Sequence, residues 1–180
     1  MSNLLIYRFV LFNLLVGVAV AGLATRTPLI EMVVTDSTFV CILIVALFVV
    51  GFLGVTKEVI VATRMRNGSV PPPKGGRDKD LEKVAWLEDV SEWLVRLGLI
   101  GTVIGFAIAL TGVAASNVGT VEGAKETVIA LMNGMRIAID TTILGAATAL
   151  WHGINVRMLR TALISYWADV ENRATYWIWP

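Results

Sequence analysis

Four long apolar runs, separated by shorter polar segments, dominate the hydrophobic pattern of the chain. They cover residues 5–24, 38–55, 94–115 and 127–151. Because a helix needs roughly 20 mostly apolar residues to cross a bilayer, each run predicts a transmembrane helix. The first three runs carry charge only near an end, whereas the fourth contains Arg136 and Asp140. The sequence therefore predicts an all-α, polytopic membrane protein with four transmembrane helices.

The segment between the second and third runs is polar and predicts a short cytoplasmic region. Its stretch "VPPPKGGRDKD", residues 70–80, contains three prolines that cannot continue a helix, and it is rich in glycine and charge. Apolar side chains then follow at helical spacing, at positions 81, 84, 87, 90 and 94. We therefore expect a short amphipathic cytoplasmic helix that leads into the third transmembrane helix.

Basic residues are distributed unevenly between the two sides of the predicted spans. Residues 57–93 hold seven Lys or Arg and the tail from residue 156 holds three, whereas the two opposite loops hold only Arg26 and Lys125. Loops rich in Lys and Arg stay in the cytoplasm. We therefore expect both termini and the middle segment to be cytoplasmic.

Composition narrows the class of protein further. The chain is 56% hydrophobic and 16% charged, with a mean hydropathy of +0.74, and soluble domains are about 25% charged. A single cysteine, Cys41, excludes an internal disulfide framework, and a single histidine, His152, argues against a histidine-built metal site. The sequence contains no Ser–His–Asp set, metal-ligand cluster or cofactor loop. We therefore expect no enzyme, no cofactor and no nucleic-acid partner.

The stretch "LGLIGTVIGF", residues 97–106, places three glycines within the third apolar run. A phosphate-binding loop would follow a strand and recruit charged residues, whereas this stretch lies in a long uncharged run. Small residues at this spacing let membrane helices approach closely, and Gly101 and Gly105 form a GxxxG pair. The residues expected to make close helix contacts are Gly98, Gly101, Gly105, Gly112, Ala138 and Gly145.

Two threonines, Thr102 and Thr142, are predicted to lie at the same depth in neighbouring antiparallel helices. Each lies two or three residues on the cytoplasmic side of the middle of its run, and a helix rises about 1.5 Å per residue. A lone membrane threonine usually bonds back to its own helix. Two hydroxyls at matched depth, each beside a face of small residues, can instead line a polar path.

Arg136 and Asp140 are four residues apart and therefore share one face of the fourth helix. A charge at the bilayer centre costs at least about 2.5–3.5 kcal/mol on insertion scales, so such residues usually pair. Two interpretations stay open. The pair holds neighbouring helices together, or Asp140 conducts or gates a cation while Arg136 tunes its ionisation. Asp140 and Thr142 lie about 200° apart around a helix, so if Thr142 lines the path, the pair faces another helix or subunit.

Three other residues have simple structural explanations. Asn13, in the first run, is expected to form a hydrogen bond between helices. Trp151 lies where the fourth run meets the cytoplasm, and tryptophan is enriched there as an interface anchor. His152, beside it, is expected to lie on the surface.

Two segments together resemble a known family. "LGLIGTVIGF" resembles the third-helix motif of the MotA/TolQ/ExbB proton-channel superfamily, and "ALMNGMRIAIDTTILGAATAL" resembles the following helix, with Thr142 and Gly145 in its Thr-x-x-Gly pattern. With this resemblance the chain divides into a peripheral helix pair, a loop with an amphipathic helix, a channel-like core and an aromatic-rich cytoplasmic tail. These four parts are residues 1–56, 57–93, 94–155 and 156–180.

The resemblance implies a homo-oligomeric ring, commonly of five subunits, in the bacterial inner membrane. The ring would enclose a dimer of a single-pass partner similar to MotB, TolR or ExbD, whose membrane aspartate takes up and releases H⁺, or alternatively Na⁺. Thr102 and Thr142 would face that aspartate, and ion flow would drive rotation or force on a periplasmic partner.

The chain also departs from the family pattern. Four spans resemble MotA, but the large cytoplasmic region by which MotA engages a rotor is replaced by residues 56–93 alone. The prolines usual in the pore helices are absent, and Arg136 and Asp140 are not typical. A non-conducting membrane scaffold that assembles through its small-residue stripes is the alternative from a different functional class.

Overall fold

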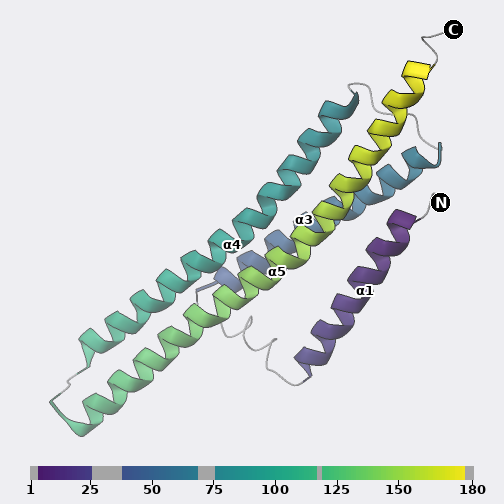
Figure 1. Ribbon diagram of the computed structural model, residues 1–180. Helices are drawn as coiled ribbons and strands as arrows, with labels where there is room; N and C mark the ends of the chain where they lie inside the picture. Colours follow the sequence, from purple (N-terminus) through teal and green to yellow (C-terminus); the bar gives the residue numbers. More distant parts are fainter. Residues whose placement is uncertain (1–3, 26–37, 69–75, 117–118, 177–180) are drawn as a thin grey trace.

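Every regular element that the structure describes is an α-helix. The computed structural model describes residues 4–25, 38–68, 76–116 and 119–176. The helices are α1 (Leu4–Ala24), α3 (Val40–Arg66), α4 (Gly76–Ala115) and α5 (Val121–Tyr176), shown in Figure 1. Each is long and apolar enough to cross a membrane. The predicted all-α architecture with four candidate membrane-spanning helices is confirmed, and the ring stays a prediction.

α4 joins the expected amphipathic segment and the third apolar run in one helix of 40 residues. No glycine or proline interrupts the sequence between positions 77 and 97, so helical hydrogen bonding continues through it. One face of this segment is buried, as its spacing predicts, through Val84, Leu87, Val90 and Leu94. A separate short cytoplasmic helix does not occur within the described ranges. The divisions drawn after residues 56, 93 and 155 all fall inside continuous helices.

α5 is 56 residues long and carries the fourth apolar run onward into the tail. Beyond the apolar run it buries Val156, Leu159, Leu163 and Trp167, at a spacing of three or four residues. The indole Nε1 of Trp167 donates a hydrogen bond to Asp80 at 3.3 Å. Through residue 173 the tail therefore packs on the chain's own helices, and the tryptophans at 177 and 179 lie outside the described residues.

The helices differ in how fully they are packed. Figure 1 shows α4 and α5 running antiparallel and side by side, with both chain termini at the same end of the molecule. α1 is buried only near its start, at Leu5 and Phe9, and the Phe9 ring stacks on Phe52 of α3 with centroids 6.1 Å apart. Further along, α1 exposes apolar side chains such as Leu14 and Val18. α1 is therefore a peripheral helix held mainly at one end.

A polar cluster ties α1 to α5. Asn13 Nδ2 donates to Asn155 Oδ1 at 2.8 Å, and the Asn13 Oδ1 accepts from Trp151 Nε1 at 2.7 Å. The predicted interhelical hydrogen bond of Asn13 is confirmed. Trp151 is half-buried rather than an exposed anchor, and its ring packs against Phe48 with centroids 5.2 Å apart.

His152 is not a surface residue, and this expectation was wrong. Its side chain is fully buried, and Nδ1 lies 2.9 Å from Ser91 Oγ of α4. The ring occupies space that Gly51 of α3 leaves open, because a Cβ at Gly51 would lie 2.6 Å from His152 Nε2. The sequence position beside Trp151 could not reveal this, since the burial depends on a residue about a hundred positions away.

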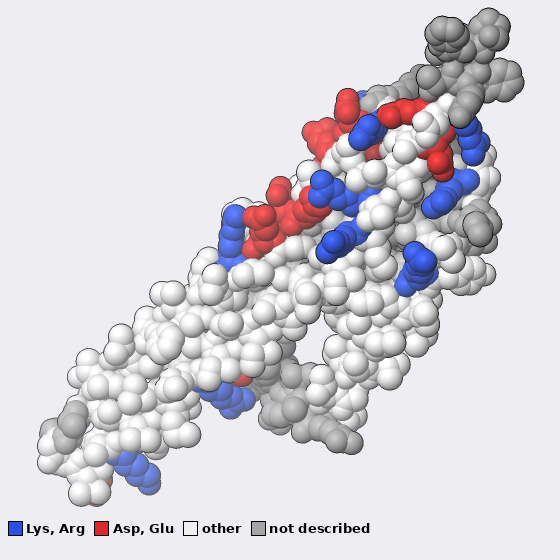
Figure 2. Space-filling model, viewed as in Figure 1, with Lys and Arg blue, Asp and Glu red and all other residues white. Residues whose placement is uncertain are grey.

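Charged side chains gather at the end of the molecule that carries both termini. Figure 2 shows Lys, Arg, Asp and Glu crowded there, while most of the remaining surface in this view is uncharged. The boundary between the two regions runs obliquely to the helices. α1 and α5 are also staggered along their length. Asn13, in the middle of α1, bonds Asn155, which lies beyond the fourth apolar run in α5.

Candidate functional site

α4 and α5 approach each other closely enough for their backbones to touch. A Cβ added at Gly105 would lie 2.6 Å from the Ala138 nitrogen and 2.7 Å from the Gly134 oxygen. One added at Gly98 would lie 3.0 Å from the Thr141 oxygen and 3.3 Å from the Gly145 Cα. No side chain fits at either position without moving the opposite helix. The close contact predicted for these glycines is therefore confirmed, and it lies within one chain.

The same contact includes Gly101, between these two glycines, and Gly112, further along α4. At Gly101 the opposing group is the Thr141 side chain, which a Cβ would meet at 2.5 Å. At Gly112 it is the Ala130 methyl, also at 2.5 Å. Thr141 is fully buried and its hydroxyl donates to the Ile137 oxygen at 2.9 Å. Its role is therefore to fill the space beside Gly101.

Two residues of this contact were not anticipated, Thr141 and Gly134. Both lie on one α5 stripe, with the successive positions 134, 138, 141 and 145, a four–three–four spacing that marks one helix face. That spacing was available in the sequence. What the sequence left open was which of the adjacent residues Thr141 and Thr142 faces α4 directly.

Thr102 and Thr142 meet beside this contact. Their Oγ1 atoms are hydrogen-bonded to each other, so the matched depth predicted for them is confirmed. The Thr102 hydroxyl also lies 3.0 Å from the Gly98 oxygen, and the Thr142 hydroxyl lies 2.9 Å from the Ala138 oxygen. Their role as lining of an ion path stays a prediction.

The two hydroxyls border a shallow apolar groove of about 270 Å³ between α4 and α5. Its other walls are apolar and exposed, through Phe106, Met135, Ile139 and Ile143. None of its lining residues is charged. The groove therefore presents two oxygen atoms in an otherwise hydrocarbon surface.

The hydroxyls of Thr102 and Thr142 have lone pairs that are free to accept a hydrogen bond or bind a cation. Each threonine has one proton and two lone pairs, and the available carbonyl partners, Gly98 and Ala138, together with the mutual bond, account for both protons. Lone pairs on Oγ1 stay available. The pair can therefore accept a hydrogen bond from an incoming acid or donate oxygen to a cation without breaking an existing bond.

Arg136 and Asp140 form an ion pair with Nε and Oδ2 3.5 Å apart. The Arg136 side chain is 54% exposed and that of Asp140 is 23% exposed. Neither residue lines the groove of Thr102 and Thr142. This agrees with the expectation that the pair faces elsewhere if Thr142 lines the path. Among the described residues no group of three or more His, Cys, Asp or Glu side chains is placed to hold a metal ion.

Comparison with known proteins returns no match among protein-family models, curated proteins or solved structures. The resemblance to the MotA/TolQ/ExbB superfamily therefore rests on the motifs in α4 and α5 alone.

Proposed function

We propose that this chain is a ring-forming subunit of an ion-driven motor or energy transducer of the bacterial inner membrane. The observation that carries the proposal is the hydroxyl pair of Thr102 and Thr142, placed at an open apolar groove between two helices in backbone contact. A transported ion needs a group that changes its protonation state or its ligands in a dry place. Threonine cannot titrate, so the groove is incomplete without a carboxylate from a second molecule.

The guest is a transmembrane helix of a single-pass partner, similar to MotB, TolR or ExbD, that carries an aspartate at the depth of the groove. A neutral carboxyl can donate its proton to the free lone pairs of Thr102 or Thr142. An ionised carboxylate needs donors, and the two threonine protons are already engaged, one in the mutual bond and the other on a backbone carbonyl. The groove therefore favours the neutral acid over the charged one, because an unpaired charge in an apolar site is costly.

This preference couples protonation of the partner carboxyl to movement of the partner helix. Protonation lets the partner helix settle into a groove, and release of the proton drives it out. In a ring, commonly of five subunits, successive grooves surround a central partner dimer, so alternate protonation turns into rotation or force on a periplasmic partner. The termini and the charged end of Figure 2 then face the cytoplasm, where positive charge is retained. Sodium is the alternative ion, with the threonine oxygens as ligands.

The non-conducting scaffold stays as the second candidate. It was inferred from the small-residue stripes, taken as contacts between copies of the chain. Gly98, Gly101, Gly105 and Gly112 pack against α5 of their own chain, so they do not supply a contact between chains in this structure. A scaffold would have to assemble through other surfaces.

The first experiment identifies the guest. A photo-crosslinking amino acid at Ile139, a wall of the groove, is expected to capture a single-pass membrane helix that contains an acidic residue. The matched control places it at Val18, an equally apolar and exposed position on the peripheral α1. Capture of such a helix at both positions, or only of a second copy of this chain at Ile139, contradicts the proposal.

The second experiment removes the hydroxyls while it keeps their shape. The double variant T102V/T142V, reconstituted in liposomes with the captured partner, is measured for proton flux with a trapped pH dye. We expect flux to fall roughly 3- to 18-fold, since a hydrogen bond between membrane helices contributes about 0.6–1.7 kcal/mol. The control T111V removes an exposed hydroxyl of the same helix that bonds only the Ile108 oxygen. Unchanged flux in T102V/T142V with normal assembly would refute the motor function.

A further inference from the structure

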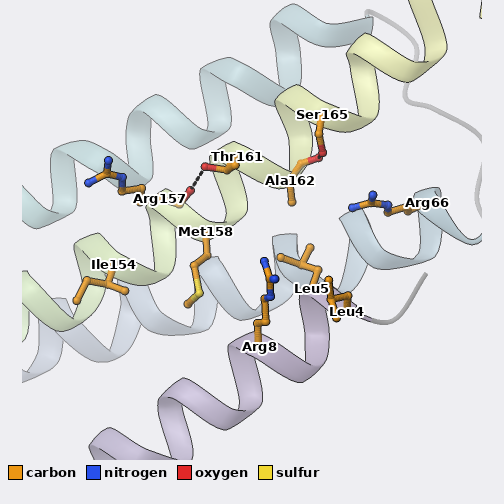
Figure 3. A pocket seen from close by; sticks show the side chains of 10 residues that line it. All are labelled: Leu4, Leu5, Arg8, Arg66, Ile154, Arg157, Met158, Thr161, Ala162 and Ser165. Carbon is orange, nitrogen blue, oxygen red and sulfur yellow. Dashed lines mark hydrogen bonds between the residues drawn. The ribbon is translucent and has the colours of Figure 1, made fainter. Parts of the chain in front are cut away.

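A second site lies at the charged end of the molecule, away from the hydroxyl groove. A pocket of about 370 Å³ opens between the first turns of α1, the last turn of α3 and residues 154–165 of α5. Figure 3 shows its lining side chains, which come from all three helices. It shares no lining residue with the groove of Thr102 and Thr142.

Two arginines from different helices point into this pocket. The guanidinium groups of Arg8 on α1 and Arg66 on α3 extend into it from separate sides in Figure 3. The Arg157 side chain points away from them, and its carbonyl oxygen accepts a hydrogen bond from Thr161 at 2.9 Å. The hydroxyl of Ser165 also lies on the wall. The Ser165 proton is donated to the Ala162 oxygen at 2.9 Å, so the pocket gathers positive charge and the hydrogen-bond donors of the two guanidinium groups.

The charge of these arginines is not balanced by a neighbouring acid. No Asp or Glu lines the pocket, and neither Arg8 nor Arg66 forms an ion pair anywhere in the part of the chain that the structure describes. Asp169 lines an adjacent hollow together with Arg66, but the two side chains are not ion-paired. An arginine pair that faces an apolar wall without a counter-charge calls for an anionic ligand.

The rest of the pocket is apolar. Leu4, Leu5, Ile154 and Met158 form its wall. Leu11, Leu15 and Val18 follow Leu4 and Arg8 at helical spacing on α1 and are exposed along the predicted span. A headgroup in the pocket would therefore have hydrocarbon surface directly below it, along which an acyl chain can lie. Arg8 also lies near the start of the first apolar run.

We propose that this pocket binds the phosphate headgroup of an anionic phospholipid from the cytoplasmic leaflet. Basic pockets between membrane helices on the cytoplasmic side bind such headgroups. Guanidinium forks match the geometry of a phosphate and bind it through paired hydrogen bonds. The bound lipid joins the start of α1 to the end of α3. The buried residues of α1, Leu5 and Phe9, lie near that start. The lipid therefore fixes the peripheral helix to the rest of the chain.

The test measures lipid binding by native mass spectrometry of the detergent-purified full chain, titrated with phosphatidylglycerol. The double variant R8Q/R66Q is expected to bind roughly 30-fold more weakly, and each single variant roughly 5-fold, from the usual contribution of one basic residue near a membrane surface. R8K/R66K keeps the charge and should stay within roughly 5-fold of the parent.

The matched control is R64Q, which removes an exposed arginine two positions from Arg66 that does not line the pocket. It should bind like the parent. Phosphatidylcholine should bind more weakly than phosphatidylglycerol, and excess inorganic phosphate should not displace the lipid. An equal loss in R64Q, an unchanged affinity in R8Q/R66Q, equal binding of phosphatidylcholine, or displacement by free phosphate would each overturn the proposal. Protection of the buried Cys41 thiol confirms that each variant is folded.

Discussion

Replacing Gly105 by alanine tests whether α4 and α5 touch through their backbones. The new Cβ would lie 2.6 Å from the Ala138 nitrogen, 2.7 Å from the Gly134 oxygen and 2.9 Å from the Ala138 Cα. All three atoms belong to the backbone of α5, so no side chain can rotate to relieve the contact. The helices must separate, and the variant should be less stable than the parent.

The expected loss of stability in G105A is the difference between two opposing effects. Overpacking a close contact costs typically about 1–3 kcal/mol, and the upper part of that range applies where the obstacle is backbone. Alanine in place of glycine returns up to about 1 kcal/mol of helix propensity. We therefore expect a net loss near 2 kcal/mol, or roughly 4–8 °C in melting temperature for a chain of this size. The control G17A, whose new Cβ would lie in open space, should not be destabilised.

A methyl exchange at the far end of the same contact should behave differently. A Cβ at Gly112 would meet the Ala130 methyl at 2.5 Å, while the next atom, the Ala130 Cα, is at an ordinary 3.6 Å. G112A alone should therefore lose about 1 kcal/mol. The double variant G112A/A130G moves the methyl from one helix to the other and should return to within about 0.5 kcal/mol of the parent.

The chain carries its own reporter of unfolding. Cys41 is the only cysteine and is 1% exposed, so a thiol-reactive fluorophore labels it only when the helices come apart. Melting curves of detergent-purified variants then give the stability differences. If G105A melts like G17A, or if G112A/A130G is as unstable as the sum of its single variants, the described approach of α4 and α5 is incorrect.

Two other polar contacts give predictions of their own. N13A should lower the melting temperature by an amount equivalent to about 0.6–1.7 kcal/mol, because it removes the hydrogen bonds to Asn155 and Trp151. N13L/N155L should lose less stability than the sum of N13L and N155L, because both single variants remove the same bond between the two asparagines; an additive loss contradicts this. D140L alone should reduce the yield of folded protein more than R136L/D140L, since it leaves Arg136 without its partner at 3.5 Å. A double variant worse than D140L would show that the pair is not an isolated unit.

Periodicity and residue size were enough to predict the helices and the contact between α4 and α5. Each of these predictions depends on residues close together in the sequence. They were the four apolar runs, the spacing of the buried residues Val84, Leu87, Val90 and Leu94, and the glycines of α4. The meeting of Thr102 and Thr142 followed from counting residues in two adjacent antiparallel spans joined by a short loop. Within such a hairpin the register is nearly fixed, so depth could be transferred from one helix to the other.

Register between distant segments could not be read in the same way. The burial of His152 depends on Gly51, and the level of α1 depends on the bonds between Asn13 and Asn155. Both contacts join segments that are far apart in the sequence. The chain between such segments does not fix how far one helix is shifted along the other. The tail was equally ambiguous, because a helix that buries Leu159, Leu163 and Trp167 has the same pattern whether it packs on its own chain or on a partner. Only the folded arrangement separates these possibilities.

The glycine contact and the hydroxyl pair follow from one physical cause. Hydroxyls on short threonine side chains can bond across two helices only if the backbones are unusually close. Gly98 and Gly105, one turn on either side of Thr102, provide that approach, and each lies against α5 backbone. A variant that keeps both threonines but separates the helices, such as G105A, should therefore lose proton flux as T102V/T142V does. If G105A separates the helices and flux persists, the hydroxyls act singly, and the paired site proposed for the groove is not the one that carries the ion.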